Sequence, residues 1–250
     1  MKSFTLISLS FLSAFAFAKP TLDVGLVKNK KGDLVIIEKH LSTYDGQKLL
    51  TLHSDYFDLE GKKFAELRSD FSKKPYLPEY TTMDERFDRF ESLKIEDNKV
   101  VLSGREKKGK KLNSKTLDYG DEMVAGQGLH NFIRDHFKEI IEKDKKFDIR
   151  FLTPVNQGDY GFRIKKLKST TDQAFFRVEF DSWLMRLVAP HIDTLYSLSP
   201  LRLLQYKGPY HLLDKDQDSQ SVTIDYLFDQ EAIDVLKKYK IPFTPQGEKS

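Results

Sequence analysis

An amphipathic stretch from Gly126 to Lys143 constrains the fold of this chain more than any other segment. Its apolar side chains recur at helical spacing and form one stripe, made of Leu129, Phe132, Ile133, Phe137, Ile140 and Ile141. Polar and charged residues occupy the intervening positions and cover the opposite side. The pattern predicts one long amphipathic helix over residues 127–143.

The rest of the chain is mostly typical of short strands separated by turns. Alternating or β-rich runs predict strands at residues 22–27, 33–43, 50–58, 64–71, 148–154, 160–167, 174–180, 194–197, 201–207 and 221–228. Residues 93–117 predict a pair of hairpins that turn at 96–99 and at 107–109. Residues 83–93 fit a helix or a charged strand, residues 183–188 fit a helical turn or a strand, and residues 230–240 predict a short helix. The expected fold class is α+β and mostly antiparallel β. It is a curved sheet or half-barrel packed around one long central amphipathic helix.

The first eighteen residues have the features of a secretory signal peptide. Lys2 is followed by an apolar run to Phe17, and Ala16-Phe17-Ala18 is a small-residue cleavage site. We therefore expect export, with the periplasm as the compartment, and a single domain over residues 19–241. The polar residues 242–250 are expected to form a disordered tail.

Composition removes several classes of function. The chain has no cysteine, which excludes disulfides, thiol nucleophiles and a lipid-modified cysteine. Of the 41 lysines and arginines, Lys2 lies in the leader, which leaves 40 against 38 acidic side chains. This balance is not that of a nucleic-acid binder. No later apolar run reaches about 18 residues, so no transmembrane span is expected after signal cleavage.

No catalytic or cofactor motif is present, and we expect neither a cofactor nor catalytic residues. His130 and His136 are six residues apart, so they do not share a helix face as the two histidines of a helical zinc site do. A G-x-S-x-G nucleophile elbow is absent. Gly126-Gln127-Gly128 lacks the rest of a phosphate-binding loop, and a flexible start to the helix explains it better.

An acidic segment near the C-terminus is similar to the start of a calcium loop. Asp214, Asp216 and Asp218 stand at positions 1, 3 and 5, and Asp225 falls at position 12. Position 6 is Ser219 rather than the glycine of such loops. A solvated acidic turn is the alternative explanation.

The chain is rich in aromatic residues, which fill β cores and also line apolar ligand sites. If the sheet is partly open, the helix face turned toward it would contact an apolar ligand. The candidate ligand-binding residues are Leu129, Phe132, Ile133, Phe137 and Ile140.

Several segments of the chain resemble two groups of exported proteins. The segments 199–206 and 221–226, with Asp214 between them, are similar to the last strands of periplasmic lipoprotein-localisation carriers. The segments 56–61, 64–65, 151–154, 160–163 and 203–208, with the central helix, resemble an uncharacterised proteobacterial exported family. The carrier resemblance implies a curved antiparallel sheet wrapped around a helix, enclosing a pocket for an acyl chain.

These observations together predict a non-enzymatic exported protein that binds or carries an apolar, lipid-like ligand. The alternative is a cell-envelope protein–protein interaction module that uses a strand edge or the charged region 83–91. A third alternative is an enzyme whose acids and histidines are dispersed along the chain.

Overall fold

The computed structural model describes residues 20–46 and 48–243. The predicted signal peptide and most of the predicted tail lie outside these residues. The strands are β1 (Thr21–Lys28), β2 (Leu34–Asp45), β3 (Lys48–Phe57), β4 (Lys63–Asp70), β5 (Glu79–Asp84), β6 (Arg89–Glu96), β7 (Lys99–Arg105), β8 (Asn113–Asp118), β9 (Met123–Ala125), β10 (Phe147–Thr153), β11 (Gly158–Ser169), β12 (Gln173–Phe180), β13 (Ile192–Leu198), β14 (Leu201–Pro209) and β15 (Ser221–Phe228). The helices are α1 (Gly128–Asp135), α2 (Phe137–Glu142), α3 (Met185–Val188) and α4 (Asp229–Lys238). Among the described residues, no helix is long and apolar enough to cross a membrane.

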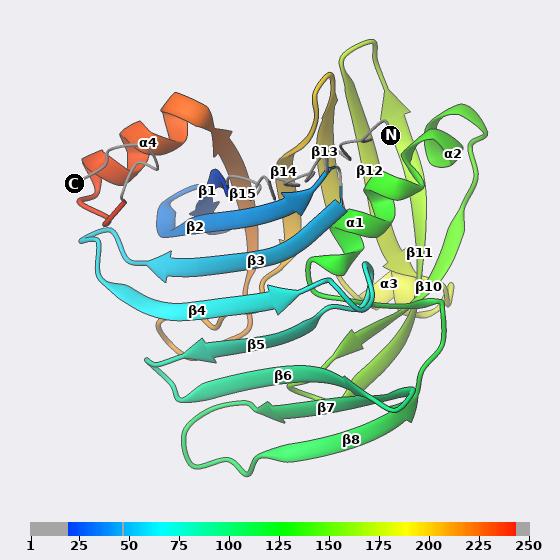
Figure 1. Ribbon diagram of the computed structural model, residues 1–250, viewed down its shortest axis with the longest axis horizontal. Helices are drawn as coiled ribbons and strands as arrows, with labels where there is room; N and C mark the ends of the chain where they lie inside the picture. The colour runs from blue at the N-terminus through cyan, green and yellow to red at the C-terminus, as the bar shows by residue number, and fades with distance from the viewer. Residues whose placement is uncertain (1–19, 47, 244–250) are drawn as a thin grey trace, which may run out of the picture.

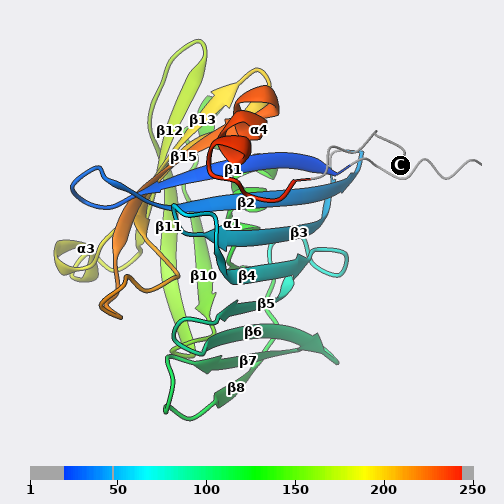
Figure 2. The same cartoon turned by 90° about the vertical axis from the view of Figure 1, so that its left-hand side faces the viewer.

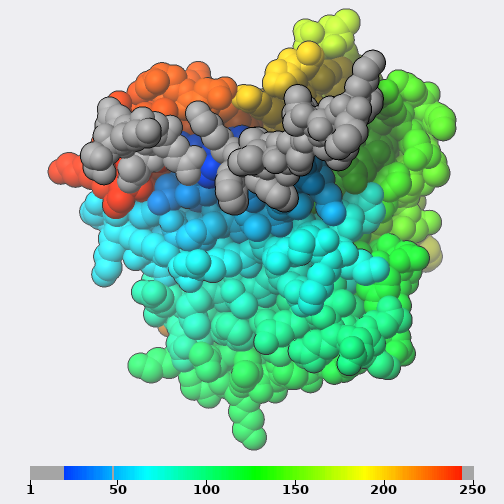
Figure 3. Space-filling model, in the orientation of Figure 1, coloured from blue at the N-terminus to red at the C-terminus, as the bar shows by residue number. Residues whose placement is uncertain are grey.

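All the strands belong to one sheet in the order β8-β7-β6-β5-β4-β3-β2-β1-β15-β14-β13-β12-β11-β10-β9. Strands adjacent in sequence are adjacent in the sheet from β1 to β8 and from β9 to β15. β1 pairs with β15, so the first and last strands lie side by side in the middle of the sheet. Every pairing is antiparallel except the short parallel pair β9–β10. Figure 1 shows β2 to β8 stacked as one arm, and Figure 3 shows that they build one broad face of the molecule.

The sheet curls until its two arms pack on each other. Leu93 of β6 and Leu102 of β7 share a buried cluster with Met123 of β9 and Leu152 of β10. The arms also meet near their edges, since the Lys115 Nζ of β8 donates to a backbone oxygen in the β10–β11 turn, 3.3 Å away. The apolar alternation that predicted the strands therefore faces a core enclosed by the sheet itself.

The predicted long central helix is wrong, and with it the predicted fold class. Residues 127–143 form two short helices, α1 and α2, separated at His136 (φ −95°, ψ 9°). The His136 ring lies 4.4 Å from the ring of Phe132 and 4.6 Å from that of Phe147 on β10. The protein is mostly β, with four short helices in its described part, and the core is filled by the sheet more than by a helix.

The predicted C-terminal helix is confirmed as α4, which covers the outer side of the central strands. Its Ala232 and Leu236 are fully buried against Val24, Ile37 and Phe57. The segment after α4 then passes the β3–β4 turn, where Gly61 has a φ of 83°. A Cβ at Gly61 would lie 2.3 Å from the backbone oxygen of Tyr239.

We expect Gly61→Ala to destabilise the protein by about 2–3 kcal/mol, because it combines a left-handed backbone with a steric clash. Gly32 is a matched control, since its φ is 89° but no atom lies within 4 Å of the added Cβ. Gly32→Ala should cost only the backbone strain, about 1 kcal/mol. Urea unfolding of both variants measures the difference, and equal losses would contradict the close packing of Tyr239, just after α4, on this turn.

Candidate functional site

The most exposed apolar surface of the described chain lies in the loop between β12 and β13, around α3. We call it the α3 patch; its members and exposed fractions are Trp183 (68%), Leu184 (60%), Met185 (41%), Leu187 (71%) and Val188 (80%). Figure 2 shows α3 projecting from the body of the molecule, at the left of that view. Contiguous exposed apolar side chains on a folded protein mark a binding surface.

The loop that carries the patch is held by its own polar groups. The Arg186 guanidinium donates to the backbone oxygen of Phe180 at 2.9 Å and also to that of Asp181. The amide of Ala189 donates to the oxygen of Met185 at 2.8 Å. Because the polar groups bond inward, the apolar side chains are presented outward on an ordered turn.

Half-buried aromatic rings occupy the strand ends from which the loop departs. The ring of Phe180, the last residue of β12, lies 4.3 Å from that of Phe162 and 6.0 Å from that of Tyr160. Phe151 follows at 5.9 Å from Phe162. Apolar character therefore extends from the α3 patch toward the inner face of β10 to β12.

The five predicted ligand-binding residues are brought together by the structure. Leu129, Phe132, Ile133 and Ile140 are buried and Phe137 is half-buried, all in one cluster over β10 to β13. Phe137 packs edge-on against Phe176 at 5.3 Å. They form part of the core, and their contact with a ligand stays a prediction.

The predicted calcium residues do not converge on one point. Asp214 Oδ1 accepts hydrogen bonds from the amides of Asp216 and Asp218, each at 2.9 Å, which makes an acidic turn. Asp225 lies within β15 and pairs with Lys28 at 2.7 Å. Among the described residues, these four are not grouped as ligands around one position.

The structure contains a buried polar network, centred on Glu38, that the sequence did not predict. His40 Nδ1 lies 2.7 Å from Ser54 Oγ, and its Nε2 lies 3.0 Å from Glu38 Oε2. Tyr210 donates to the other oxygen of Glu38 at 2.7 Å. Burial alone raises the pKa of Glu38, but the bonds from His40 and Tyr210 outweigh it and hold that pKa below its usual value.

Ser54, His40 and Glu38 are hydrogen-bonded in the sequence serine–histidine–acid of a hydrolytic triad. The serine is nevertheless not placed for catalysis. Ser54 is fully buried, so its hydroxyl has no exposed surface for a substrate to approach. The network instead provides hydrogen-bond partners, His40 and Tyr210, to the buried carboxylate of Glu38. The sequence signal was the period-two spacing of Glu38 and His40 in a predicted strand.

A groove of about 620 Å³ crosses β3 to β6 on the other arm. The residues that line it are Thr51, Leu52, His53, Arg68, Ser69, Asp70, Glu79, Tyr80, Thr81, Ser92, Leu93 and Lys94. Most of them have polar side chains, but the surface they expose to the groove is mostly apolar.

Comparisons with known proteins assign no family. No family model and no curated protein matches the chain. One solved structure, a beta-barrel-like protein of domain of unknown function DUF1849 from Brucella abortus, is similar at 8% sequence identity and a TM-score of 0.44. The similarity covers 86% of this chain and 100% of that one. The resemblance to exported carrier families therefore stays a prediction.

Proposed function

We propose that this chain is an exported, non-enzymatic protein of the cell envelope that binds lipid, and that it contacts the lipid through the α3 patch. The observation that carries the proposal is the exposure of five large apolar side chains on one ordered turn. The signal-like leader supports export, with the periplasm as the compartment.

The shape of the patch favours lipid over a rigid protein partner. A projecting turn with tryptophan at its start can insert into the interface of a bilayer, where an indole ring is well accommodated. Burying a large apolar side chain contributes about 1.5–3 kcal/mol, so five partly buried ones supply on the order of 5 kcal/mol. That is enough for reversible attachment to a lipid surface.

The interaction-module alternative draws less support from the region 83–91. Most of its charged side chains form ion pairs within the same arm: Asp84 pairs with Arg86, Glu91 with Arg89, and Asp88 with Arg105. Ion pairs that are already satisfied give little net gain to a partner protein.

Trp183 is the one tryptophan of the chain, so its fluorescence reports directly on the patch. We expect phospholipid vesicles to shift its emission to shorter wavelength, because the indole leaves water, and to carry the protein with them in flotation. The double variant Leu187→Asp, Val188→Asp should bind vesicles at least about tenfold more weakly, since two apolar anchors become charged.

Leu112→Asp is the matched control, because Leu112 is 55% exposed but lies in the β7–β8 connection. It should bind vesicles like the unaltered protein. Absence of an emission shift with the unaltered protein, or equal weakening by both changes, would contradict the proposal.

A further inference from the structure

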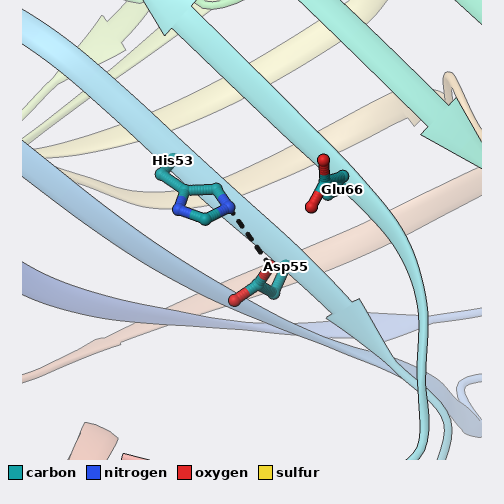
Figure 4. Close-up of side chains that lie close together, drawn as sticks. All are labelled: His53, Asp55 and Glu66. Carbon is teal, nitrogen blue, oxygen red and sulfur yellow. Dashed lines mark ion pairs between the residues drawn. The ribbon is translucent and has the colours of Figure 1, made fainter.

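Three potential metal ligands meet on the arm opposite the α3 patch. His53 and Asp55 are two residues apart on β3 and share one face of the strand, and Asp55 is paired directly with Glu66 on β4. One ligand atom from each residue lies within 4.8 Å of the other two. Figure 4 shows the three side chains turned toward a common space.

Two atoms of this group are shielded from solvent. They are His53 Nε2, which has no hydrogen-bond partner, and Asp55 Oδ1, which faces it. They lie 3.3 Å apart. The ligands of a tetrahedral zinc ion, bound at about 2.0 Å, are separated by about 3.3 Å. The pair therefore already has the spacing that a shared ion requires.

A cation already occupies the space between the carboxylates. Lys63 Nζ lies 2.6 Å from Asp55 Oδ1 and 2.7 Å from Glu66 Oε2. The outer carboxylate oxygens are held by other groups, Asp55 Oδ2 by Lys39 at 3.0 Å and Glu66 Oε1 by Arg68 at 3.4 Å. The inner oxygens and the imidazole nitrogen therefore face one cation position. The Lys63 side chain is long and partly exposed, so its ammonium can move out of that position into solvent.

The geometry points to a site for a divalent transition-metal ion, Zn²⁺ by its ligand types, held by His53, Asp55 and Glu66 in place of the Lys63 ammonium. One imidazole nitrogen and two carboxylate oxygens are a zinc ligand set that leaves a fourth position for water. Lys39 and Arg68 orient the carboxylates from behind, as outer groups do in metal sites. His53 also lines the 620 Å³ groove, which places the water position beside that groove.

Cobalt is the probe that tests this site, because tetrahedral Co²⁺ absorbs visible light more strongly than hydrated Co²⁺. We expect the untagged protein to bind one Co²⁺ with a tetrahedral spectrum and to release it to Zn²⁺. His53→Ala and Glu66→Gln should each weaken binding at least about tenfold. Lys63→Ala should tighten binding by a similar factor, because the competing ammonium is gone.

His191 and Asp193 supply a matched control within the same chain. They repeat the His-x-Asp spacing, with His191 Nε2 3.3 Å from Asp193 Oδ2, but this pair is outside the three-ligand group found among the described residues. His191→Ala should therefore leave Co²⁺ binding unchanged. Circular dichroism confirms that each variant is folded.

Three results would overturn the proposal. The first is no Co²⁺ binding by the unaltered protein and the Lys63→Ala variant, and the second is unchanged binding after His53→Ala. The third is binding only after Lys63→Ala, which would show that the lysine is the resident cation of this cluster.

Discussion

Glu38→Ala is expected to destabilise the protein by about 3–5 kcal/mol, because it leaves buried polar partners without the carboxylate they bond. Glu38 is 2% exposed and accepts bonds from both His40 and Tyr210. Tyr210 is itself buried, so its hydroxyl would lose its acceptor without gaining water. Since the free energy of unfolding of a domain is about 5–15 kcal/mol, this change removes a large part of it.

Chemical denaturation at pH 7.5 measures the loss in free energy of unfolding, and two further variants serve as comparisons. Glu38→Gln keeps an acceptor for Tyr210 and should lose less than the alanine variant. Glu60→Ala, on the exposed β3–β4 turn, should change stability by less than about 0.5 kcal/mol. A loss below about 1 kcal/mol for Glu38→Ala would contradict the role given to the network.

Acidification from pH 6.5 to 4.5 is expected to weaken the fold before ordinary carboxylates titrate. Burial lowers the pKa of His211 to about 4 and that of His130 to about 3. In this range the unfolded chain binds protons at both histidines while the folded chain does not. The free energy of unfolding should therefore fall with pH, by about 1.4 kcal/mol per pH unit for each histidine below the unfolded pKa.

The surroundings of the two imidazole rings explain why the pKa of each histidine is lowered. His211 packs against the rings of Tyr56 and Tyr210 at 5.2 and 4.8 Å, and its Nε2 has no hydrogen-bond partner. His130 stacks on Tyr196, whose hydroxyl lies 2.9 Å from His130 Nδ1. Neither arrangement places a carboxylate against the ring, so the charged form loses water without gaining a direct ionic partner.

Unfolding curves at pH 7.5, 6.5, 5.5 and 4.5 measure this effect, and the variants His211→Gln and His130→Gln identify its source. In each variant the free energy of unfolding should depend less steeply on pH, since glutamine does not titrate. Burial also raises the pKa of Glu91, which opposes the trend at the acid end as that side chain takes up its proton in the folded state. Stability that is constant from pH 6.5 to 4.5 would contradict the expectation.

Local patterns predicted much of the secondary structure, and long-range contacts decided the remainder. The alternation in β2 and β3 and the turn at Gly61 could be identified because strands and tight turns depend on neighbouring residues. The break at His136 could not, because the helical stripe continues across it and the aromatic partner Phe147 comes from β10. The α3 patch was equally hidden, since an apolar run such as residues 183–188 also suits a buried strand.

The candidate sites depended on register as well as on residue type. His53-x-Asp55 ahead of the Glu60-Gly61 turn is visible in the sequence, and counting across that hairpin points to Glu66. The burial of Glu38 could not be predicted in the same way, because its two-residue spacing from His40 shows only a shared strand face, and an acidic residue in a strand is normally solvated. Its partner Tyr210 is 172 residues away in the chain.

By itself, the sequence determined the succession of strands and turns, the helical character around residue 130 and the absence of thiol chemistry, because these depend on residue type and near neighbours. Only the tertiary structure decided that the sheet curls into contact with itself, that Glu38 is enclosed and that Trp183 is exposed. The physical reason is that burial is a property of distant segments brought together, and no local period records which of them will meet.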